Sequence, residues 1–120
     1  MIYMAAIFYV SSLHRAPLPA GVSDKVAHAF GYMGLGFVLA RALGGGAASG
    51  ITLRDLAIGL AVAVAYAASD EFHQRFVPGR TAELTDLLAD AIGATSALIA
   101  SWWWGIISRR GRQPPSRRQL

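Results

Sequence analysis

Residues 68–80 read Ala68-Ser69-Asp70-Glu71-Phe72-His73-Gln74-Arg75-Phe76-Val77-Pro78-Gly79-Arg80. This short stretch gathers two carboxylates, a histidine, an amide and two arginines around a Pro-Gly pair, which is typical of a turn. The residues before it, from Leu53 onward, are mostly apolar and include alanines at 61, 63, 65 and 67, which suit close packing of membrane helices. The sequence therefore predicts a membrane-spanning helix over about 53–74 that ends in a polar cluster at the membrane surface.

The composition of the whole chain agrees with a membrane protein. Hydrophobic residues make up 54% of the 120 residues and charged residues only 15%, and the mean hydropathy is +0.41. Soluble domains are less apolar, and here the apolar residues form blocks of a length that suits membrane spans. The absence of cysteine excludes a disulfide framework, a thiolate nucleophile and a zinc site with cysteine ligands. We predict an all-α fold, a bundle of four transmembrane helices.

Three further apolar segments are the other predicted spans, at about 1–13, 25–43 and 86–107. The first would form only about 20 Å of helix, against a hydrocarbon core of roughly 30 Å. It lacks the basic start and the cleavage site of a signal peptide, so we expect an uncleaved span. Residues 1–107 then form one transmembrane domain, and residues 108–120 form a basic tail that we expect to be disordered in the cytoplasm.

The basic residues predict the orientation of the four spans. Five arginines, at 109, 110, 112, 117 and 118, follow the last apolar block, which is typical of a cytoplasmic flank. An even number of spans places both termini on that side. Seven of the eleven basic residues then lie in the cytoplasm, including Arg41 and Arg54 near the middle loop. Because the arginines flank a membrane span, we expect a lipid bilayer and not a nucleic acid as the partner.

This orientation brings the polar side chains of three spans to the outer end of the bundle. The inner end carries arginines, Asp55 and tryptophans but no histidine. On the last span, a stripe of Asp86, Asp90, Gly93 and Ala97 has helical spacing and should face the bundle, since polar side chains at membrane depth avoid lipid. The residues that we expect at the outer end are Asp24, Lys25, His28, Asp70, Glu71, His73, Gln74, Arg75, Arg80, Asp86 and Asp90.

Three motifs resemble those of the VanZ-like family of small bacterial integral membrane proteins. They are Asp24-Lys25-Val26-Ala27-His28, then Asp70-Glu71-Phe72-His73-Gln74 with Pro78-Gly79-Arg80, and Asp86 with Gly93 in the last span. The resemblance implies a multi-pass protein of the bacterial cytoplasmic membrane with a role in the cell envelope, because the founding member is linked to resistance against the glycopeptide teicoplanin. It implies no particular biochemical activity. The short first span and short loops depart from the family pattern, so no drug specificity is carried over.

The first functional hypothesis is binding of an anionic envelope molecule, such as a lipid that carries phosphate. Lys25, Arg75 and Arg80 would supply positive charge and hydrogen bonds to phosphate, which arginine can make in pairs. The helix N-termini near Asp24 and Asp86 would add backbone N–H donors. The carboxylates of the outer end outnumber these bases, so a bound anion would need a cation beside it. The candidate binding residues are Lys25, Gln74, Arg75, Arg80, Asp24 and Asp86.

Two alternatives stay open. A metal-dependent or His/carboxylate-dependent enzyme could act on a lipid-linked substrate, with His28, His73, Asp70 and Glu71 as candidate catalytic residues or metal ligands. A divalent metal would offset the excess of carboxylates, yet no established ligand motif is present. The cluster could also be a structural network, since polar groups at membrane depth must pair with one another. The sequence leaves the cofactor, any catalysis and the oligomeric state open.

Overall fold

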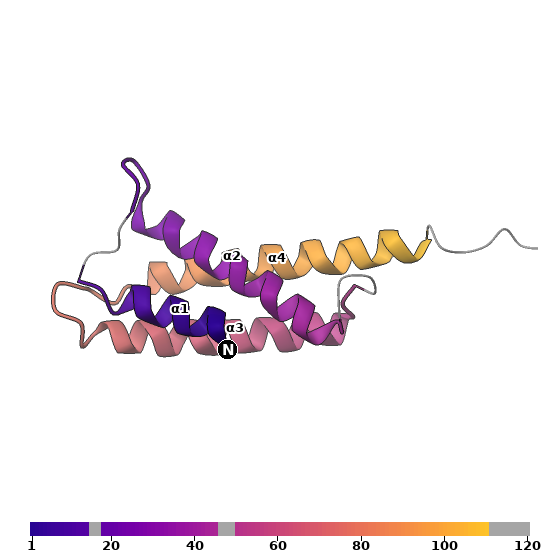
Figure 1. Ribbon diagram of the computed structural model, residues 1–120, viewed down its shortest axis with the longest axis horizontal. Helices are drawn as coiled ribbons and strands as arrows, with labels where there is room; N and C mark the ends of the chain where they lie inside the picture. Colours follow the sequence, from indigo (N-terminus) through magenta and orange to yellow (C-terminus); the bar gives the residue numbers. More distant parts are fainter. Residues whose placement is uncertain (15–17, 46–49, 111–120) are drawn as a thin grey trace, which may run out of the picture.

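The computed structural model describes residues 1–14, 18–45 and 50–110, and within them the protein is an all-α bundle without strands. Its helices are α1 (Ile2–Ser11), α2 (Asp24–Leu43), α3 (Leu53–Gln74) and α4 (Leu84–Arg110) (Figure 1). The predicted all-α fold is confirmed for this part of the chain, and each predicted span corresponds to one helix. α4 includes Ser108 to Arg110, which the sequence assigned to the tail; residues 111–120 of that tail lie outside the described residues.

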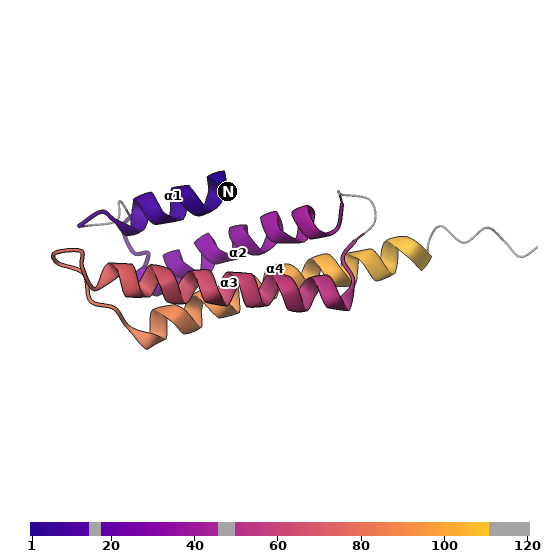
Figure 2. The same cartoon turned by 90° about the horizontal axis from the view of Figure 1, so that it is seen from below.

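Successive helices run in opposite directions, so one end of the bundle collects the starts of α2 and α4 and the ends of α1 and α3 (Figure 1). α1 is short and lies along only the half of the bundle next to this end (Figure 2). We call this end the polar end, and the other one, around Thr52, Asp55 and Gly105, the opposite end. The charged and polar residues of the polar end include Asp24, Lys25, His28, Asp70, Glu71, His73, Gln74, Arg80, Glu83, Asp86 and Asp90.

α2 and α4 make the most extensive helix contact of the bundle, because two glycines remove the side chains that would keep the helices apart. A Cβ atom on Gly93 would collide with the backbone carbonyl of Ala29, and one on Gly36 would lie 2.6 Å from the carbonyl oxygen of Ala94. Small residues at an interface allow helix backbones to approach closely. The predicted inward-facing stripe on α4 is confirmed, since all of its residues are buried.

By length and composition, two helices of the described part of the chain could cross a membrane. These are α2, over Asp24–Leu43, and α4, over Leu84–Ser108. α1 has 10 residues and is too short for a full crossing. α3 has 22 residues, but charged or polar side chains at both of its ends shorten the apolar stretch. The bundle of four membrane spans is therefore supported for two of its helices and otherwise stays a prediction.

The outer surfaces of the helices are strongly apolar, whereas the core is built mainly of small residues. Phe30 of α2, Val62 of α3 and Ile92 of α4 are exposed by 64%, 39% and 65%. Half of the buried hydrophobic residues that the structure describes are alanines, and the larger ones include Tyr32 and Leu98. Large apolar groups outside and small residues inside are typical of helices that pack in lipid.

Local capping fixes where the helices begin. The Oγ atom of Ser23 accepts a hydrogen bond of 3.3 Å from the N–H of Val26, so Ser23 caps α2. Thr52 and Asp55 form a reciprocal capping box at the start of α3. Between α3 and α4, Gly79 has φ +81°, in the left-handed region that favours glycine. This geometry explains the glycine of the predicted Pro-Gly turn.

Candidate functional site

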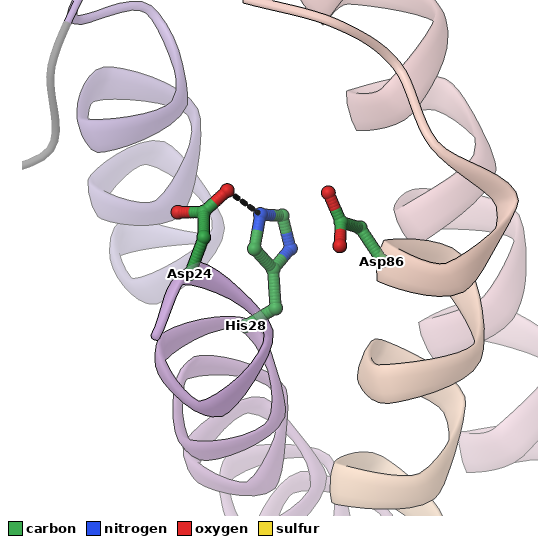
Figure 3. Close-up of side chains that lie close together, drawn as sticks. All are labelled: Asp24, His28 and Asp86. Carbon is green, nitrogen blue, oxygen red and sulfur yellow. Dashed lines mark ion pairs between the residues drawn. The ribbon is translucent and has the colours of Figure 1, made fainter. Parts of the chain in front are cut away.

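His28 and Asp90 form a deeply buried pair at the polar end. The Nδ1 atom of His28 lies 2.9 Å from Oδ1 of Asp90, and the two side chains are exposed by only 10% and 1%. Gly93 makes this contact reachable, since it lies one helical turn after Asp90 and lets α4 approach the backbone of Ala29, next to His28. The Nε2 atom of His28 lies on the side of Asp24, 3.8 Å from its Oδ2 (Figure 3).

Lys25 connects the start of α2 with the start of α4. Its ammonium group donates hydrogen bonds of 2.8 Å to Oε2 of Glu83 and of 3.1 Å to Oδ1 of Asp86. The bond from Lys25, with a second one from Thr85, holds the pKa of Glu83 below its usual range, because both stabilise the charged carboxylate. Asp86 is buried and Glu83 is half-exposed, so Lys25 joins a rim carboxylate to an interior one.

Arg80 links the turn after α3 to α1 and α2. Its Nε donates to the backbone carbonyl of Leu13 at 3.3 Å, and its Nη1 lies 3.5 Å from Oδ2 of Asp24. The Arg80 side chain is mostly buried, whereas Asp24 is half-exposed. A guanidinium group has five N–H donors, so these two contacts leave donors available for a further acceptor.

Four carboxylates are buried at the polar end, more than the neighbouring bases can neutralise. Asp70, Glu71, Asp86 and Asp90 are exposed by 3%, 8%, 3% and 0%. Within the described residues, Oδ1 of Asp70, Oε1 of Glu71 and Oδ2 of Asp90 have no hydrogen-bond partner. Buried carboxylate oxygens without partners cost free energy and are rare in structures. They are expected where a site receives a cation or a ligand.

A cavity of about 270 Å³, which we call the inner cavity, lies between α1, α2 and α3. Its apolar wall comes mainly from α1, with Tyr3, Ala6, Ile7 and Val10. Leu18 and residues of α2 such as Ala27 add to this apolar lining. The polar part of the lining combines a hydroxyl, an amide, an imidazole, carboxylates and a guanidinium group. The residues of this polar lining include Ser11, Asp24, His28, Asp70, Gln74 and Arg80.

A second cavity of about 340 Å³, the outer cavity, lies beside the first. Asp24 and Arg80 line both cavities, so their ion pair lies between the two. The outer cavity is strongly polar, because most of its lining is charged. Its residues are His14, Leu18, Asp24, Lys25, Gly79, Arg80, Thr81, Glu83 and Asp86.

All predicted binding residues except Arg75 line one or both cavities. Arg75 is exposed, with its guanidinium carbon 5.9 Å from the ring centroid of Phe72, and it lines neither the inner nor the outer cavity. Of the predicted catalytic or metal-binding residues, His28 and Asp70 line the inner cavity. The structure thus brings these two together with the binding candidates.

The other two candidates for catalysis or metal binding have different surroundings. The Nε2 atom of His73 lies 3.1 Å from Oγ of Ser12, and its ring packs on Phe8 with 4.4 Å between the centroids. His73 therefore holds α1 against α3. The Oε2 atom of Glu71 accepts a hydrogen bond of 3.0 Å from the backbone N–H of Glu83 and so ties the loop before α4 to the end of α3.

One group of side chains has the spacing of a metal site. Asp24, His28 and Asp86 each offer one ligand atom, and these atoms all lie within 4.8 Å of one another (Figure 3). Asp24 and His28 are one turn apart on α2, and Asp86 faces them from the first turn of α4. This group is the only one of its kind among the residues that the structure describes, and it includes neither Asp70 nor His73.

Sequence reasoning gave no specific role to Asp90, Ser11 or Ser12. The position of Asp90, four residues after Asp86, predicted that it faces the bundle, but its partner depends on how far α4 is shifted along α2. Ser11 is buried and lines the inner cavity. In the sequence, Ser11 and Ser12 look like ordinary polar residues at the end of a short span, so nothing marks them as part of a site.

Comparison with known proteins adds one match. A model of the family described as VanZ/LLP1 matches residues 2–105 of the chain, and thus all of α1, α2 and α3 and most of α4. No curated protein and no solved structure matches the chain.

Proposed function

Because the chain belongs to the VanZ/LLP1 family, we propose that it is a multi-pass protein of the bacterial cytoplasmic membrane that binds an anionic, lipid-linked molecule of the cell envelope at its outer surface. Family membership and two apolar helices fit a membrane protein of the VanZ type. The single observation that carries the binding proposal is the inner cavity, in which an apolar wall meets a cluster of charged side chains.

In the proposed arrangement, α3 crosses the membrane beside α2 and α4. Its 22 residues give about 33 Å of helix at 1.5 Å per residue, which is enough for the hydrocarbon core. Val62 of α3 is exposed in the middle of the helix, at a level where lipid would cover it. The basic residues of the middle loop and the tail favour the cytoplasm for these two segments, whereas the N-terminus, at the start of the short α1, would lie within the bilayer (Figure 2). The polar end then lies at the outer surface, and α1 extends part of the way into the outer half of the bilayer.

The lining of the inner cavity suits an amphiphilic molecule. The apolar side chains of α1 offer a surface for the first carbons of a lipid chain, while Arg80 and Gln74 lie at the polar side. Water occupies about 30 Å³ per molecule in the liquid, so 270 Å³ holds a head group and a few carbons but not a whole lipid. The remainder of the chain would lie in the bilayer.

The positive groups at the polar end favour a phosphate head group. Arg80 has N–H donors that are not used by Leu13 or Asp24, and arginine binds phosphate through paired N–H groups. Lys25 lies across the outer cavity at the start of α2, where backbone N–H groups also favour an anion. The buried carboxylates oppose an anion, so the proposal requires a cation or protons on some of them. A phosphate that approaches from the outer cavity meets Lys25 and Arg80 first.

The proposal is tested by native mass spectrometry of the full chain in detergent, with a prenyl monophosphate as the probe and the prenyl alcohol of equal length as its uncharged counterpart. We expect wild-type protein to retain the phosphate and not the alcohol. Arg80→Ala should weaken retention about tenfold or more, because hydrogen bonds to a charged group contribute roughly 1.5–3 kcal/mol. Ile7→Trp should also weaken it, by filling the apolar wall of the cavity.

The matched control is Arg75→Ala, which removes an equal charge from the same surface but from outside both cavities. It should retain the phosphate as wild type does. Circular dichroism shows whether each variant keeps its helices. Equal retention by Arg80→Ala and wild type, or equal retention of phosphate and alcohol, would contradict the proposed binding.

A further inference from the structure

We propose that Asp24, His28 and Asp86 bind a divalent cation of the zinc or manganese class, and that Asp90 positions His28 for it. The inference concerns a metal, and the lipid proposed above is not needed for it. It differs from the metal set suggested by the sequence, which paired His28 with His73, since the structure joins His73 to α1.

The three ligands come from two helices that a backbone contact holds in register. Asp24 and His28 project from successive turns of α2, and Asp86 projects from α4 toward them (Figure 3). The close approach at Gly93 sets the distance between the two helices. Ligand atoms that lie up to 4.8 Å apart need to move slightly closer to contact one ion, because two ligands at about 2.1 Å from a metal lie at most about 4.2 Å apart. Small side-chain movements therefore complete the site.

Asp90 gives His28 the orientation that a metal ligand needs. Its carboxylate lies 2.9 Å from Nδ1 of His28 and is fully buried, so an Nδ1–H donates to it. The lone pair of Nε2 then points to the side of Asp24, 3.8 Å away. Histidine ligands usually donate their second ring N–H to a carboxylate, which fixes the tautomer and raises the basicity of the ligand nitrogen. The buried Oδ2 of Asp90 has no partner among the described residues, and its residual charge adds to the attraction for a cation.

The donor set selects the class of metal. One imidazole nitrogen with two carboxylates suits Zn²⁺ or Mn²⁺, whereas Mg²⁺ prefers oxygen ligands and retains its water. Three protein ligands leave a coordination position open, as in catalytic zinc sites. Asp24 lines both cavities and Asp86 lines the outer one, so this open position is within reach of a molecule in either cavity.

Lys25 and Arg80 hold the ligands when no metal is bound. Lys25 contacts Asp86 at 3.1 Å, and Arg80 contacts Asp24 at 3.5 Å. A divalent cation would repel both basic groups and take their place on the two aspartates. If the proposed lipid function also holds, the released groups are then available for a phosphate head group, which resolves the excess of acids at the polar end.

The test is a calorimetric titration of the full chain in detergent, prepared without a histidine tag and stripped with a chelator, using ZnCl₂, MnCl₂ and MgCl₂ as separate probes. We expect one Zn²⁺ or Mn²⁺ per chain and much weaker Mg²⁺ binding. His28→Ala should lower the affinity more than about 100-fold, and Asp90→Asn about 10–100-fold, as for other groups that orient a metal ligand. Lys25→Met should raise the affinity, because it removes a competing cation.

His73→Ala is the matched control, since it removes another histidine at this end of the bundle, one that contacts Ser12, and it should leave the metal affinity unchanged. Asp24→Asn changes a half-exposed ligand and serves as a second variant if loss of the buried His28 unfolds the protein. In Mn²⁺-loaded protein, electron paramagnetic resonance should show a bound signal that His28→Ala abolishes and His73→Ala retains. Wild-type protein that binds Zn²⁺ and Mn²⁺ no better than Mg²⁺, or Lys25→Met protein with weaker metal binding, would overturn the proposal. Lipid retention is measured separately, so the failure of one proposal does not decide the other.

Discussion

Asp55 and Asp86 occupy similar positions, in the first turns of α3 and α4, yet the two ends of the bundle use them differently. Asp55 accepts hydrogen bonds from the N–H and the hydroxyl of Thr52, at 2.9 and 2.7 Å, and caps its own helix. Asp86 is buried and bonds to Lys25, 61 positions away in the sequence. Helix capping accounts for Asp55. It does not account for an acid that is buried with three others at the meeting point of the helices.

A cavity alone does not distinguish the two ends. The opposite end also has one, of about 390 Å³, between α2, α4 and the residues before α3. Arg41 is its only charged lining residue among the described part of the chain, and no carboxylate lines it. The difference therefore lies in the chemistry of the polar end, where acids from three helices converge. Each of the following substitutions tests whether those acids serve the fold or a function.

The largest effect is expected from Gly93→Ala, which tests what holds the polar end together. The new methyl group would collide with the carbonyl of Ala29, and backbone on both helices must move. We expect the free energy of unfolding to fall by about 3 kcal/mol, at the upper end of the usual cost of overpacking. Thermal unfolding in detergent, followed by circular dichroism, measures it.

Gly31→Ala on α2 is the control for Gly93→Ala, since its methyl group would meet nothing within 4 Å. It should leave stability unchanged or raise it by about 0.5–1 kcal/mol through helix propensity. If Gly93→Ala and Gly31→Ala lowered the free energy of unfolding equally, the α2–α4 backbone contact would not set the geometry of His28 and Asp90.

Asp70→Asn and Asp55→Asn should change the stability of the protein in opposite directions. Asp70→Asn removes a buried charge whose Oδ1 has no partner among the described residues, so we expect the free energy of unfolding to rise by about 0.5–2 kcal/mol, as when a strained functional site is relieved. Asp55→Asn weakens a complete capping box and should lower stability. Chemical or thermal unfolding of both variants beside wild type gives the two signs.

Whether Asp70→Asn raises or lowers the free energy of unfolding distinguishes a functional site from a structural network. In a network, each acid stabilises the contacts between helices, and Asp70→Asn would be destabilising like Asp55→Asn. Loss of stability in both variants would remove the difference between the ends of the bundle and would favour the structural interpretation.

The sequence predicted the helices and the end where the polar residues meet, because helical spacing and the positions of loops are local properties. It could not predict the pairing of His28 with Asp90, which depends on the shift between α2 and α4 that Gly93 and Ala29 establish. Nor could it predict that His73 contacts Ser12, because the docking of a short helix leaves no periodic pattern. The metal group, which has Asp24 and Asp86 in place of Asp70, Glu71 and His73, depends on this packing.

The smallest effect is expected at the rim, where Glu83→Gln removes a half-exposed partner of Lys25. Exposed ion pairs contribute little to stability, so the useful readout is pH dependence. In the folded protein the pKa of Glu83 is lowered by hydrogen bonds from Lys25 and Thr85. Its stabilising contribution is therefore present above the ordinary pKa of a glutamate and is lost as the pH falls through the lowered value. Unfolding temperatures of wild type and Glu83→Gln should differ slightly at neutral pH and coincide at strongly acidic pH. A difference that persists in acid would show that Glu83 acts through its shape and packing, and the rim would then resemble the capped opposite end.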